Sequence, residues 1–550
     1  MNQEAITTET LDHHGLVAAT IQDLGIIEKI DKRIEKNKDP RRIVSTGKSV
    51  AALILNGLGF TNRRLYLVSQ FFENKPLDRL LGDKNIKPEN LNDDALGKAL
   101  DEIAEYGTTK LFAEIAFEIA RDQGLFGKFG RFDTSTISVE GSYDNQEGEE
   151  VVNITYGYSK NHRSDLKQMT ILLGMTGKSN LPFWFETLDG NKSDKQSLHE
   201  SVLAMKNFYK QIEAAPDLTC VADAALYNAK NLLAEQNRFF WITRVPETIK
   251  ETRELLEYPA NGKNWQQFTD NPKYSFYMHH SNYGGVEQRW MIIHSEEKFK
   301  KERKTFKKNI KSKKEGVEKE FKALSRKVFA CREDAIKKLN SFKKKNPLFE
   351  ILGKVKEITK YASGGRPKKN KSPQVVGYAI EGSILINESA VTQLLQRKGK
   401  FILATNRLDK EVLPDESILS EYKEQNSVER GFAFLKDPWF MAHSIYLKSE
   451  RRISALMMIM TLCLLVYNFA QYKARKILRE TGDTLPNQVK KQVQNPTLKW
   501  IFLNMEGITV VNLAGKINSF KSDFVANLNP IRKKIIALFG INAKIIYGFS

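Results

Sequence analysis

The stretch Tyr422-Lys-Glu-Gln-Asn-Ser-Val-Glu-Arg-Gly-Phe-Ala-Phe-Leu-Lys436 decides how the rest of the chain is interpreted. It contains no proline, and Asp437-Pro438 follows it, so the pattern predicts one helix that ends just after Lys436. At about 100° per residue, four polar side chains share one helix face: Tyr422, Gln425, Glu429 and Lys436. An adjacent stripe is apolar, formed by Val428, Phe432 and Leu435. Such a helix packs along one side and presents polar groups along the other, although an ordinary amphipathic helix shows the same pattern.

Length and composition describe a folded protein with a polyanionic partner. The chain has 550 residues, 41% of them hydrophobic and 28% charged, which indicates two to four globular units rather than a disordered chain. Its formal net charge is +20. A balance this basic favours nucleic acid over a membrane as the partner.

Cysteine usage indicates a reducing compartment. Cys220, Cys331 and Cys463 lie far apart, so the chain predicts neither a disulfide framework nor a zinc knuckle.

The N-terminus lacks a basic segment followed by an apolar one, so no secretory leader is expected. The apolar run Ile453–Ala470 is near the lower length limit for a membrane span and is interrupted by polar residues. We therefore expect a core helix there, and no membrane association.

Periodicity divides the chain into five regions. Residues 1–125 are predicted to form a helical N-terminal domain that binds DNA. Val50–Leu65 could form a helix-turn-helix within it, although a plain helical hairpin fits the loose pattern better. His13 and His14 lack partner ligands, so we expect them in a solvated terminus. The remaining regions are a first core part (126–245), an insertion (246–399), a second core part (400–475) and a C-terminal region (476–550) with a helix near Pro530–Phe539.

The core regions show the period of a mixed α/β sheet. Three strands are expected first, at 127–139, Asn153–Tyr158 and Gln168–Met175, with Pro182–Leu188 extending the sheet. A helix from Ser193 to Ile212, a strand at Leu218–Asp223, a helix at Asn228–Gln236 and a strand at Arg238–Arg244 follow. This is the order of a ribonuclease H-like fold. The insertion has strands at Tyr274–His280, Val286–His294 and Gln374–Asn387 around a basic helical region, Glu297–Lys345, and a strand at Lys400–Asn406 resumes the core.

Two carboxylates occupy unusual places in the predicted strands. Asp133 lies in the middle of the first strand, and Asp223 ends the strand before the last. Charged residues are seldom left inside strands unless they are paired or bind a metal. Taken alone, an Asp at a strand end is more often a cap or turn residue.

The spacing of Tyr422, Gln425, Glu429 and Lys436 resembles the Y-x2-R-x3-E-x6-K signature of one large branch of bacterial insertion-sequence transposases of the DDE class. Gln425 departs from this signature, which has an arginine there. Further stretches are similar to the same branch and extend the resemblance over about 125–475: Tyr156–Gln168, Leu188–Asp194, Val221–Leu226 and Thr405-Asn406. The resemblance implies a ribonuclease H-like catalytic core with three catalytic, metal-binding acids: Asp133, Asp223 and Glu429.

Three acids suit the chemistry of cutting DNA. The attacking and leaving oxygens lie in line across one phosphorus, and two divalent ions about 3.5–4 Å apart stabilise the charge on both. Carboxylate oxygens suit two Mg²⁺ ions, for which Mn²⁺ can substitute, whereas zinc would call for a Cys/His cluster. The resemblance implies that Asp133 bridges both ions while Asp223 and Glu429 each hold one.

The resemblance also implies DNA contacts from Tyr422, Gln425 and Lys436, and from a second group at Lys160, His162 and Arg163. A surface turn is an equal alternative for His162. In related transposases a tryptophan of the insertion receives a flipped base. Trp265 and Trp290 are the candidates here, although a core position fits either of them better.

The leading interpretation is a DNA transposase that binds terminal inverted repeats, cleaves DNA and transfers strands by cut-and-paste transposition. Its partners would be double-stranded DNA of the element ends and target, with a homodimer forming on DNA in the nucleoid of the bacterial cytoplasm. The alternatives are a ribonuclease H-like nuclease without strand transfer and a catalytically silent DNA-binding relative.

The region Lys298–Lys345 holds 20 Lys and Arg against 6 Asp and Glu. We expect a helical hairpin that follows DNA phosphates, with a solvated, partly disordered charge run as the alternative.

Overall fold

The structure is a computed structural model that describes residues 6–34, 42–60, 67–139, 141, 143, 152–158, 163–212, 217–234, 239–259, 262, 264–361, 372–437, 447, 449–513 and 523–549. The chain divides into two compact units. The first combines Met1–Ile242 with Leu419–Ser550, and the second is Thr243–Ile418. The second unit begins close to the expected insertion but also contains the strand β12 (Lys400–Thr405), which we expected in the core. The five region boundaries stay a prediction.

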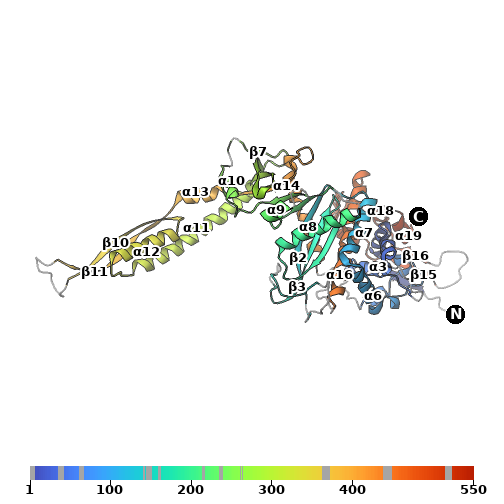
Figure 1. Ribbon diagram of the computed structural model, residues 1–550. Coiled ribbons are helices and arrows are strands. Elements are labelled where there is room, and N and C mark those ends of the chain that lie inside the picture. Colours follow the sequence, from blue (N-terminus) through green and yellow to red (C-terminus); the bar gives the residue numbers. More distant parts are fainter. Residues whose placement is uncertain are drawn as a thin grey trace. The chain divides into compact units, whose positions relative to one another are not determined.

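The N-terminal part of the first unit is helical, as its periodicity predicts (Figure 1). Its α-helices are α1 (His14–Asp23), α2 (Ile26–Ile34), α3 (Thr46–Gly57), α4 (Val68–Phe72), α5 (Leu77–Leu81), α6 (Asp93–Tyr106) and α7 (Thr108–Asp122), with a 3-10 turn at Pro88–Leu91. Side-chain caps start two of them: Ser45 accepts from the Lys48 amide and Asn92 from the Ala95 amide. The second half of the candidate helix-turn-helix lies outside the described residues.

The C-terminal region packs onto these helices. Strand β1 (Ile6–Thr10) pairs antiparallel with β15 (Thr509–Leu513), which pairs in turn with β16 (Asp523–Ala526). The remaining C-terminal elements are β13 (Leu485–Pro486), β14 (Gln492–Val493), α17 (Leu498–Asn504), α18 (Pro530–Leu538) and α19 (Ile541–Ile546). Helix α18 confirms the helix expected near Pro530–Phe539. One apolar core joins residues from the N-terminal helices, the sheet and the C-terminal region.

His13 and His14 lie in this core, so their expected placement in a solvated terminus is wrong. The His13 ring stacks on Phe502 at a centroid distance of 4.4 Å, and its Nε2 lies 2.9 Å from the Leu58 carbonyl oxygen. Burial lowers the pKa of His13 to about 4 and holds the pKa of His14 well below its usual value. Pairing of β1 with β15 draws this segment inward, which local sequence does not reveal.

Helix α16 (Glu450–Glu480) contains the long apolar run. In the described part of the chain it is the single helix long and apolar enough to cross a membrane, and 83% of its most apolar window is buried inside the protein. It packs against α3 and α6 and against a strand of the sheet. The expected core helix is what the structure shows.

The first unit's sheet has the order β4-β3-β2-β5-β6. Its strands are β2 (Phe129–Val139), β3 (Lys167–Thr176), β4 (Leu181–Leu188), β5 (Thr219–Ala222) and β6 (Phe240–Arg244), with helices α8 (Asp194–Gln211) and α9 (Ala229–Ala234) between them in sequence. β2, β3 and β4 are antiparallel neighbours, and β5 is parallel to β2. The sheet and its helices are mixed α/β, as expected, and a ribonuclease H-like core stays a prediction.

One expected strand is wrong. The segment Asn153–Tyr158 makes only an isolated bridge between Thr155 and Gln168, and β4 occupies the third place instead. The segment is also in close contact with the residues after β4: the Gly190 amide donates to the Asn153 carbonyl oxygen, and a Cβ on Gly157 would lie 2.2 Å from the Gly190 carbonyl oxygen. The segment therefore touches the start of β3 without running along it.

The second unit holds the sheet β12-β9-β8-β7 and a long hairpin arm. The sheet strands besides β12 are β7 (Gln266–Gln267), β8 (Tyr274–Ser281) and β9 (Gln288–Ser295), accompanied by helices α10 (Lys250–Glu257) and α13 (Glu388–Gln396) and a 3-10 turn at Tyr283–Gly285. The arm consists of α11 (Glu296–Ser325), α12 (Arg332–Lys345), β10 (Phe349–Lys360) and β11 (Gln374–Ile386) (Figure 1).

The arm confirms the predicted helical hairpin and adds a strand that we did not expect. The buried stripe of α11 and α12, which includes Phe321 and Leu339, packs on Ile351 of β10 and Ile380 of β11. β10 alternates exposed charge with apolar residues, and it pairs antiparallel with β11 along its length. The basic helices therefore lie on a two-stranded ribbon, which leaves most of their lysines exposed.

Candidate functional site: a face with three carboxylates

The stretch Tyr422–Lys436 forms two helices, so the prediction of one helix is wrong. Helix α14 (Asp415–Lys423) ends before Glu424, and α15 (Asn426–Leu435) begins after Gln425. The amides of Gln425, Ser427 and Val428 each bond the carbonyl three residues back, which tightens the chain between the helices. Tyr422 is half-buried on α14, whereas Glu429 belongs to α15. The predicted end near Lys436 is confirmed.

Helix α15 is attached to β2 at both ends. The Gln425 amide Nε2 lies 3.5 Å from the Phe132 carbonyl oxygen, and the Lys436 ammonium donates to Ser135 Oγ at 2.7 Å. Between these two attachments, Glu429 is exposed. The apolar stripe predicted for this helix is buried in the core: Val428, Phe432 and Leu435. Packing of that stripe leaves Glu429 on the side of the helix that faces out of the core.

The register of the sheet brings Asp133 and Asp223 to neighbouring positions. β2 and β5 run parallel, and Arg131 pairs with Val221. Continuing this register by two residues places Asp133 beside Asp223, which is exposed just past the end of β5. Parallel strands are held about 4.8 Å apart, so the two carboxylates emerge from adjacent backbones.

Asp133 lies on the face of the sheet that meets α14 and α15. Arg131 Nη2 donates to Glu421 on α14 at 2.6 Å, and Ser135 accepts from Lys436. Because side chains alternate along a strand, Asp133 points to the same side as Arg131 and Ser135. The three predicted carboxylates therefore come from three adjacent elements that share one face.

These carboxylates do not converge on a single point in this structure. Within the described ranges, no group of three or more His, Cys, Asp or Glu side chains could hold a metal ion. Asp133 Oδ1 accepts from the Thr134 amide, and Asp223 Oδ1 accepts from the Ala225 amide, each at 2.8 Å. The donor set is all carboxylate oxygen on one face, and this chemistry fits hard divalent cations.

The other residues predicted to contact DNA have different surroundings. Arg163 is exposed and pairs with Asp165 at 2.8 Å, while Lys160 and His162 lie outside the described residues. Gln425 and Lys436 bond β2, as described above. Their contacts with DNA stay a prediction.

The two candidate tryptophans differ. Trp290 is fully buried in β9, and its Nε1 donates to Gln288 Oε1 at 2.9 Å. This burial matches the core position that fits Trp290 better, and a stacking role for Trp290 stays an untested prediction. Trp265 is half-buried, with the Tyr277 ring 4.9 Å away at its edge and the Lys400 ammonium 5.8 Å from its ring centroid. Base stacking by Trp265 stays a prediction.

Sequence reasoning missed the ion pair between Arg131 and Glu421. Arg131 is 6% exposed, and burial raises the pKa of the Glu421 carboxyl although the Arg131 guanidinium lowers it. The available signal was the alternation of the first strand, which places Arg131 on the same side as Asp133. The partner on α14 lies 290 residues away in sequence, so only the fold identifies it.

Comparisons with known proteins concern the chain as a whole. A family model described as a transposase DDE domain matches residues 128–466, and one described as a domain of unknown function matches residues 6–117. No protein of curated function matched the chain.

The solved structures that are distantly similar to the chain include two transposase complexes. The piggyBac transposase synaptic complex with hairpin DNA is 12% identical, covering 92% of this chain and 82% of that chain with a TM-score of 0.35. The Mos1 transposase paired-end complex with left transposon end is 10% identical, covering 38% of this chain and 60% of that chain with a TM-score of 0.14. TM-scores this low do not establish a shared fold, and neither structure carries an argument about this chain.

Proposed function

Because the chain belongs to the transposase DDE domain family, we propose that it cleaves the ends of a DNA element and joins them to target DNA by cut-and-paste transposition. The observation that supports this most directly is the shared face of Asp133, Asp223 and Glu429. Asp133 lies on β2 and Asp223 follows the end of the parallel strand β5, while α15, which carries Glu429, is bonded to β2. We also propose that the chain belongs to the insertion-sequence branch with the Y-x2-R-x3-E-x6-K signature.

In this proposal, Asp133, Asp223 and Glu429 hold two divalent ions, Mg²⁺ or Mn²⁺. Bound there, the ions would stabilise charge on the attacking and leaving oxygens of an in-line displacement at phosphorus. The protein's own contribution is to hold the three acids on rigid neighbouring elements, which lowers the cost of orienting DNA and metal.

Other residues would position the acids and the DNA. Lys436 donates to Ser135 of β2, so it fixes the position of Glu429 relative to Asp133, and the long contact of Gln425 with Phe132 adds little. The exposed lysines of the arm would hold the phosphates of a bound DNA end, since such contacts position DNA without specifying its sequence. We propose that the protein acts as a homodimer that pairs two element ends in the bacterial cytoplasm.

Strand transfer separates this proposal from a simple nuclease. The substrate is a duplex that carries the inverted repeat flanking the gene, offered uncut or already cut at its 3′ end, with plasmid as target and Mg²⁺ or Mn²⁺ present. Cleavage of the first substrate and joining of the second support the proposal. Cleavage without joining would make the protein a nuclease, and binding without either reaction would make it a silent DNA-binding relative.

A further inference from the structure

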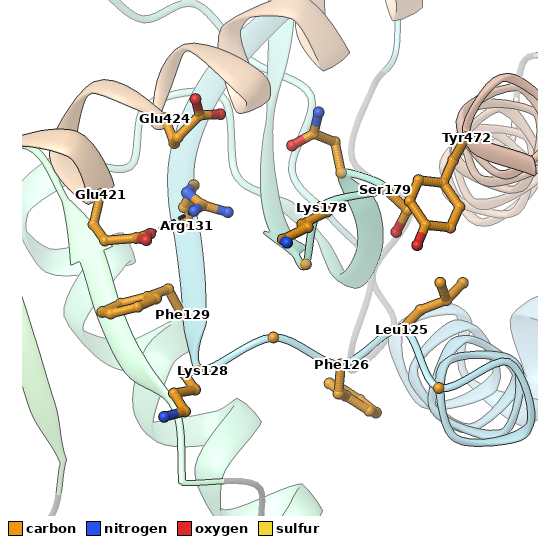
Figure 2. Close-up of a pocket in the computed structure, with 14 residues that line it drawn as sticks. Leu125, Phe126, Lys128, Phe129, Arg131, Lys178, Ser179, Glu421, Glu424 and Tyr472 are labelled. Atoms are coloured by element: carbon orange, nitrogen blue, oxygen red, sulfur yellow. Dashed lines mark hydrogen bonds and ion pairs between the residues drawn. The ribbon is translucent and has the colours of Figure 1, made fainter. Parts of the chain in front are cut away.

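A pocket of about 570 Å³ opens in the first unit beside the start of β2. Its walls come from the link between α7 and β2, from the turn between β3 and β4, and from the end of α14 with the turn after it (Figure 2). Pockets of this size suit small organic ligands, including a single nucleotide. None of the carboxylates proposed for catalysis lines it.

Two buried polar atoms in the pocket wall lack partners. Arg131 and Ser179 are 6% and 5% exposed. Although Arg131 Nη2 bonds Glu421, no hydrogen-bond partner for Arg131 Nε or for Ser179 Oγ occurs in the described part of the chain. Leaving a buried polar group without a hydrogen bond is destabilising, so native proteins usually supply a partner. An N–H donor and a hydroxyl, both buried among the residues that line this pocket, indicate a polar ligand.

The charge of the pocket favours an anion. Lys128 and Lys178 are exposed at its edge, and Figure 2 shows Lys178 and Arg131 extending toward each other. Arg131 neutralises Glu421, which leaves two lysines against Glu424. A phosphate group matches this combination of ammonium, guanidinium and hydroxyl donors.

The remaining wall is aromatic. Phe126, Phe129 and Tyr472 line the pocket, and all three are half-buried. Aromatic rings beside cationic donors form the usual surroundings of a nucleotide in single-stranded nucleic acid, where the base stacks and the phosphate pairs. An inorganic anion would leave these rings without a partner.

The pocket is rigid where the two loops meet. Gly177 has φ +67°, and a Cβ there would lie 2.2 Å from the Leu125 carbonyl oxygen. The turn after β3 therefore packs directly on the link before β2. This close approach holds Lys178 and Ser179 opposite Arg131 before any ligand binds.

The pocket lies next to the proposed catalytic face. Arg131 precedes Asp133 by two residues on the same side of β2, a separation of about 7 Å along a strand. This is a distance that one nucleotide of a DNA strand can span.

We propose that this pocket binds one nucleotide of a DNA strand, adjacent to the phosphate that is cleaved. Its phosphate would meet Arg131 Nε, Ser179 Oγ and Lys178, and its base would stack on Phe129 or Tyr472. The inference rests on the proposed function for the identity of the ligand as DNA. The nucleotide next to the cleaved bond would then contact the protein at the start of β2. Arg131 and Ser179 would be residues that bind DNA.

The first test measures binding of a short labelled single-stranded oligonucleotide, without divalent metal, by fluorescence anisotropy. Ser179→Ala and Lys178→Ala should each weaken binding, and the double variant should weaken it about tenfold, or about 1.4 kcal/mol. Lys98→Ala, which removes an exposed lysine from α6, is the matched control and should bind normally. Free deoxyadenosine monophosphate should compete with the oligonucleotide for the unchanged protein but not for the double variant.

Equal oligonucleotide affinity for the double variant and the Lys98→Ala control would overturn the proposal. A second result would also overturn the proposal: the variants bind the oligonucleotide normally, although free deoxyadenosine monophosphate still competes for the unchanged protein. The pocket would then bind a free nucleotide and not a nucleotide of a DNA strand.

A second test locates the bound strand. An end duplex with 4-thiothymidine next to the cleaved position is irradiated with the Asp133→Asn protein, and the cross-linked peptide is identified by mass spectrometry. Cross-links to Phe129 or Tyr472 support the proposal, whereas cross-links confined to the second unit contradict it. Failure of the proposed transposition is a separate result, since oligonucleotide binding in the first test needs neither cleavage nor metal.

Discussion

The Lys436 ammonium lies 2.7 Å from the Ser135 hydroxyl oxygen and joins the end of α15 to the first strand of the sheet. Ser135 is two residues from Asp133, so this bond connects the element that carries Glu429 to the strand that carries the first acid. A lysine expected to contact DNA phosphate therefore has a partner inside the protein. Positioning of Glu429 is a second role for this side chain.

Lys436→Met and Ser135→Ala distinguish the two roles. If Lys436 mainly positions α15, each change should slow cleavage by about tenfold, with affinity for end DNA unchanged. The double variant should then be no slower than either single one, because both remove the same bond. Kinetics of cleavage and a titration of end DNA provide the comparison. Weaker DNA binding by Lys436→Met alone, with Ser135→Ala normal, would show that the lysine contacts phosphate instead.

Neutral substitutions of the three acids should abolish cleavage. Asp133→Asn, Asp223→Asn and Glu429→Gln keep the shape of each side chain but remove the charge that holds a divalent ion. End binding should remain close to normal, since phosphate contacts come from other residues. The exposed Asp165→Asn is a control for loss of one surface carboxylate and should cleave normally. Cleavage by Asp223→Asn within a few fold of the unchanged protein would show that the second ligand is assigned wrongly.

Gln425 should tolerate substitution better than its neighbours. Its contact with the Phe132 carbonyl oxygen is long, at 3.5 Å, so Gln425→Ala should change cleavage little. Gln425→Arg restores the arginine of the signature, and its charge should hold DNA ends as tightly or more tightly. Both variants are assayed for end affinity and cleavage rate. A loss on Gln425→Ala as large as that on Glu429→Gln would reveal a role that the structure does not explain.

The arm should contribute much of the salt dependence of DNA binding. Six of its exposed lysines can be changed to glutamine together: Lys304, Lys308, Lys313, Lys319, Lys337 and Lys338. If each of them neutralises one phosphate, the slope of log affinity against log salt should become shallower by about 5, at about 0.9 per contact. Affinity should fall nearly equally for all DNA sequences.

This experiment compares end DNA with unrelated duplex from about 50 to 200 mM salt. The buried stripe of the arm is untouched by the six changes, so circular dichroism should remain that of the unchanged protein. Parallel salt slopes for the two proteins would show that the arm does not touch DNA, and we would then assign it to contacts between protomers.

The buried histidines should make the first unit sensitive to acid. The unfolded chain protonates His13 near pH 6.5, whereas the folded chain does so only near pH 4. Above about pH 7, His13 therefore leaves the free energy of unfolding unchanged. As the pH decreases from 6.5 towards 4, the free energy of unfolding falls, and His13 alone lowers it by about 2 kcal/mol between pH 7 and pH 5. The depressed pKa of His14 adds to the loss in the same direction.

His13→Phe preserves the stacking on Phe502 and removes the titrating group. Urea unfolding at pH 7 and pH 5 should show a smaller acid-induced loss for His13→Phe than for the unchanged protein. His280→Phe, at an exposed position on β8, is the matched control and should keep the full loss. An equal loss in all three proteins would mean that another group causes the acid sensitivity.

The sequence by itself determined the local elements of this protein. Side-chain period two identified β2 around Asp133, β5 before Asp223 and β12, and helical period identified α16 and the hairpin of α11 and α12. These patterns depend on neighbours within a few residues, so they can be read along the chain. The spacing of Tyr422, Gln425, Glu429 and Lys436 likewise singled out the candidate face before any fold was known.

The tertiary structure alone decided how distant segments meet. Pairing of β1 with β15 buries His13 in the core, and the Arg131–Glu421 ion pair joins residues 290 positions apart. The break between α14 and α15, and the ribbon beneath the basic arm, likewise follow from packing against remote partners. The same local pattern is compatible with many partners. Strand register, burial and long-range ion pairs therefore depend on the free energy of contact between segments that lie far apart in the sequence.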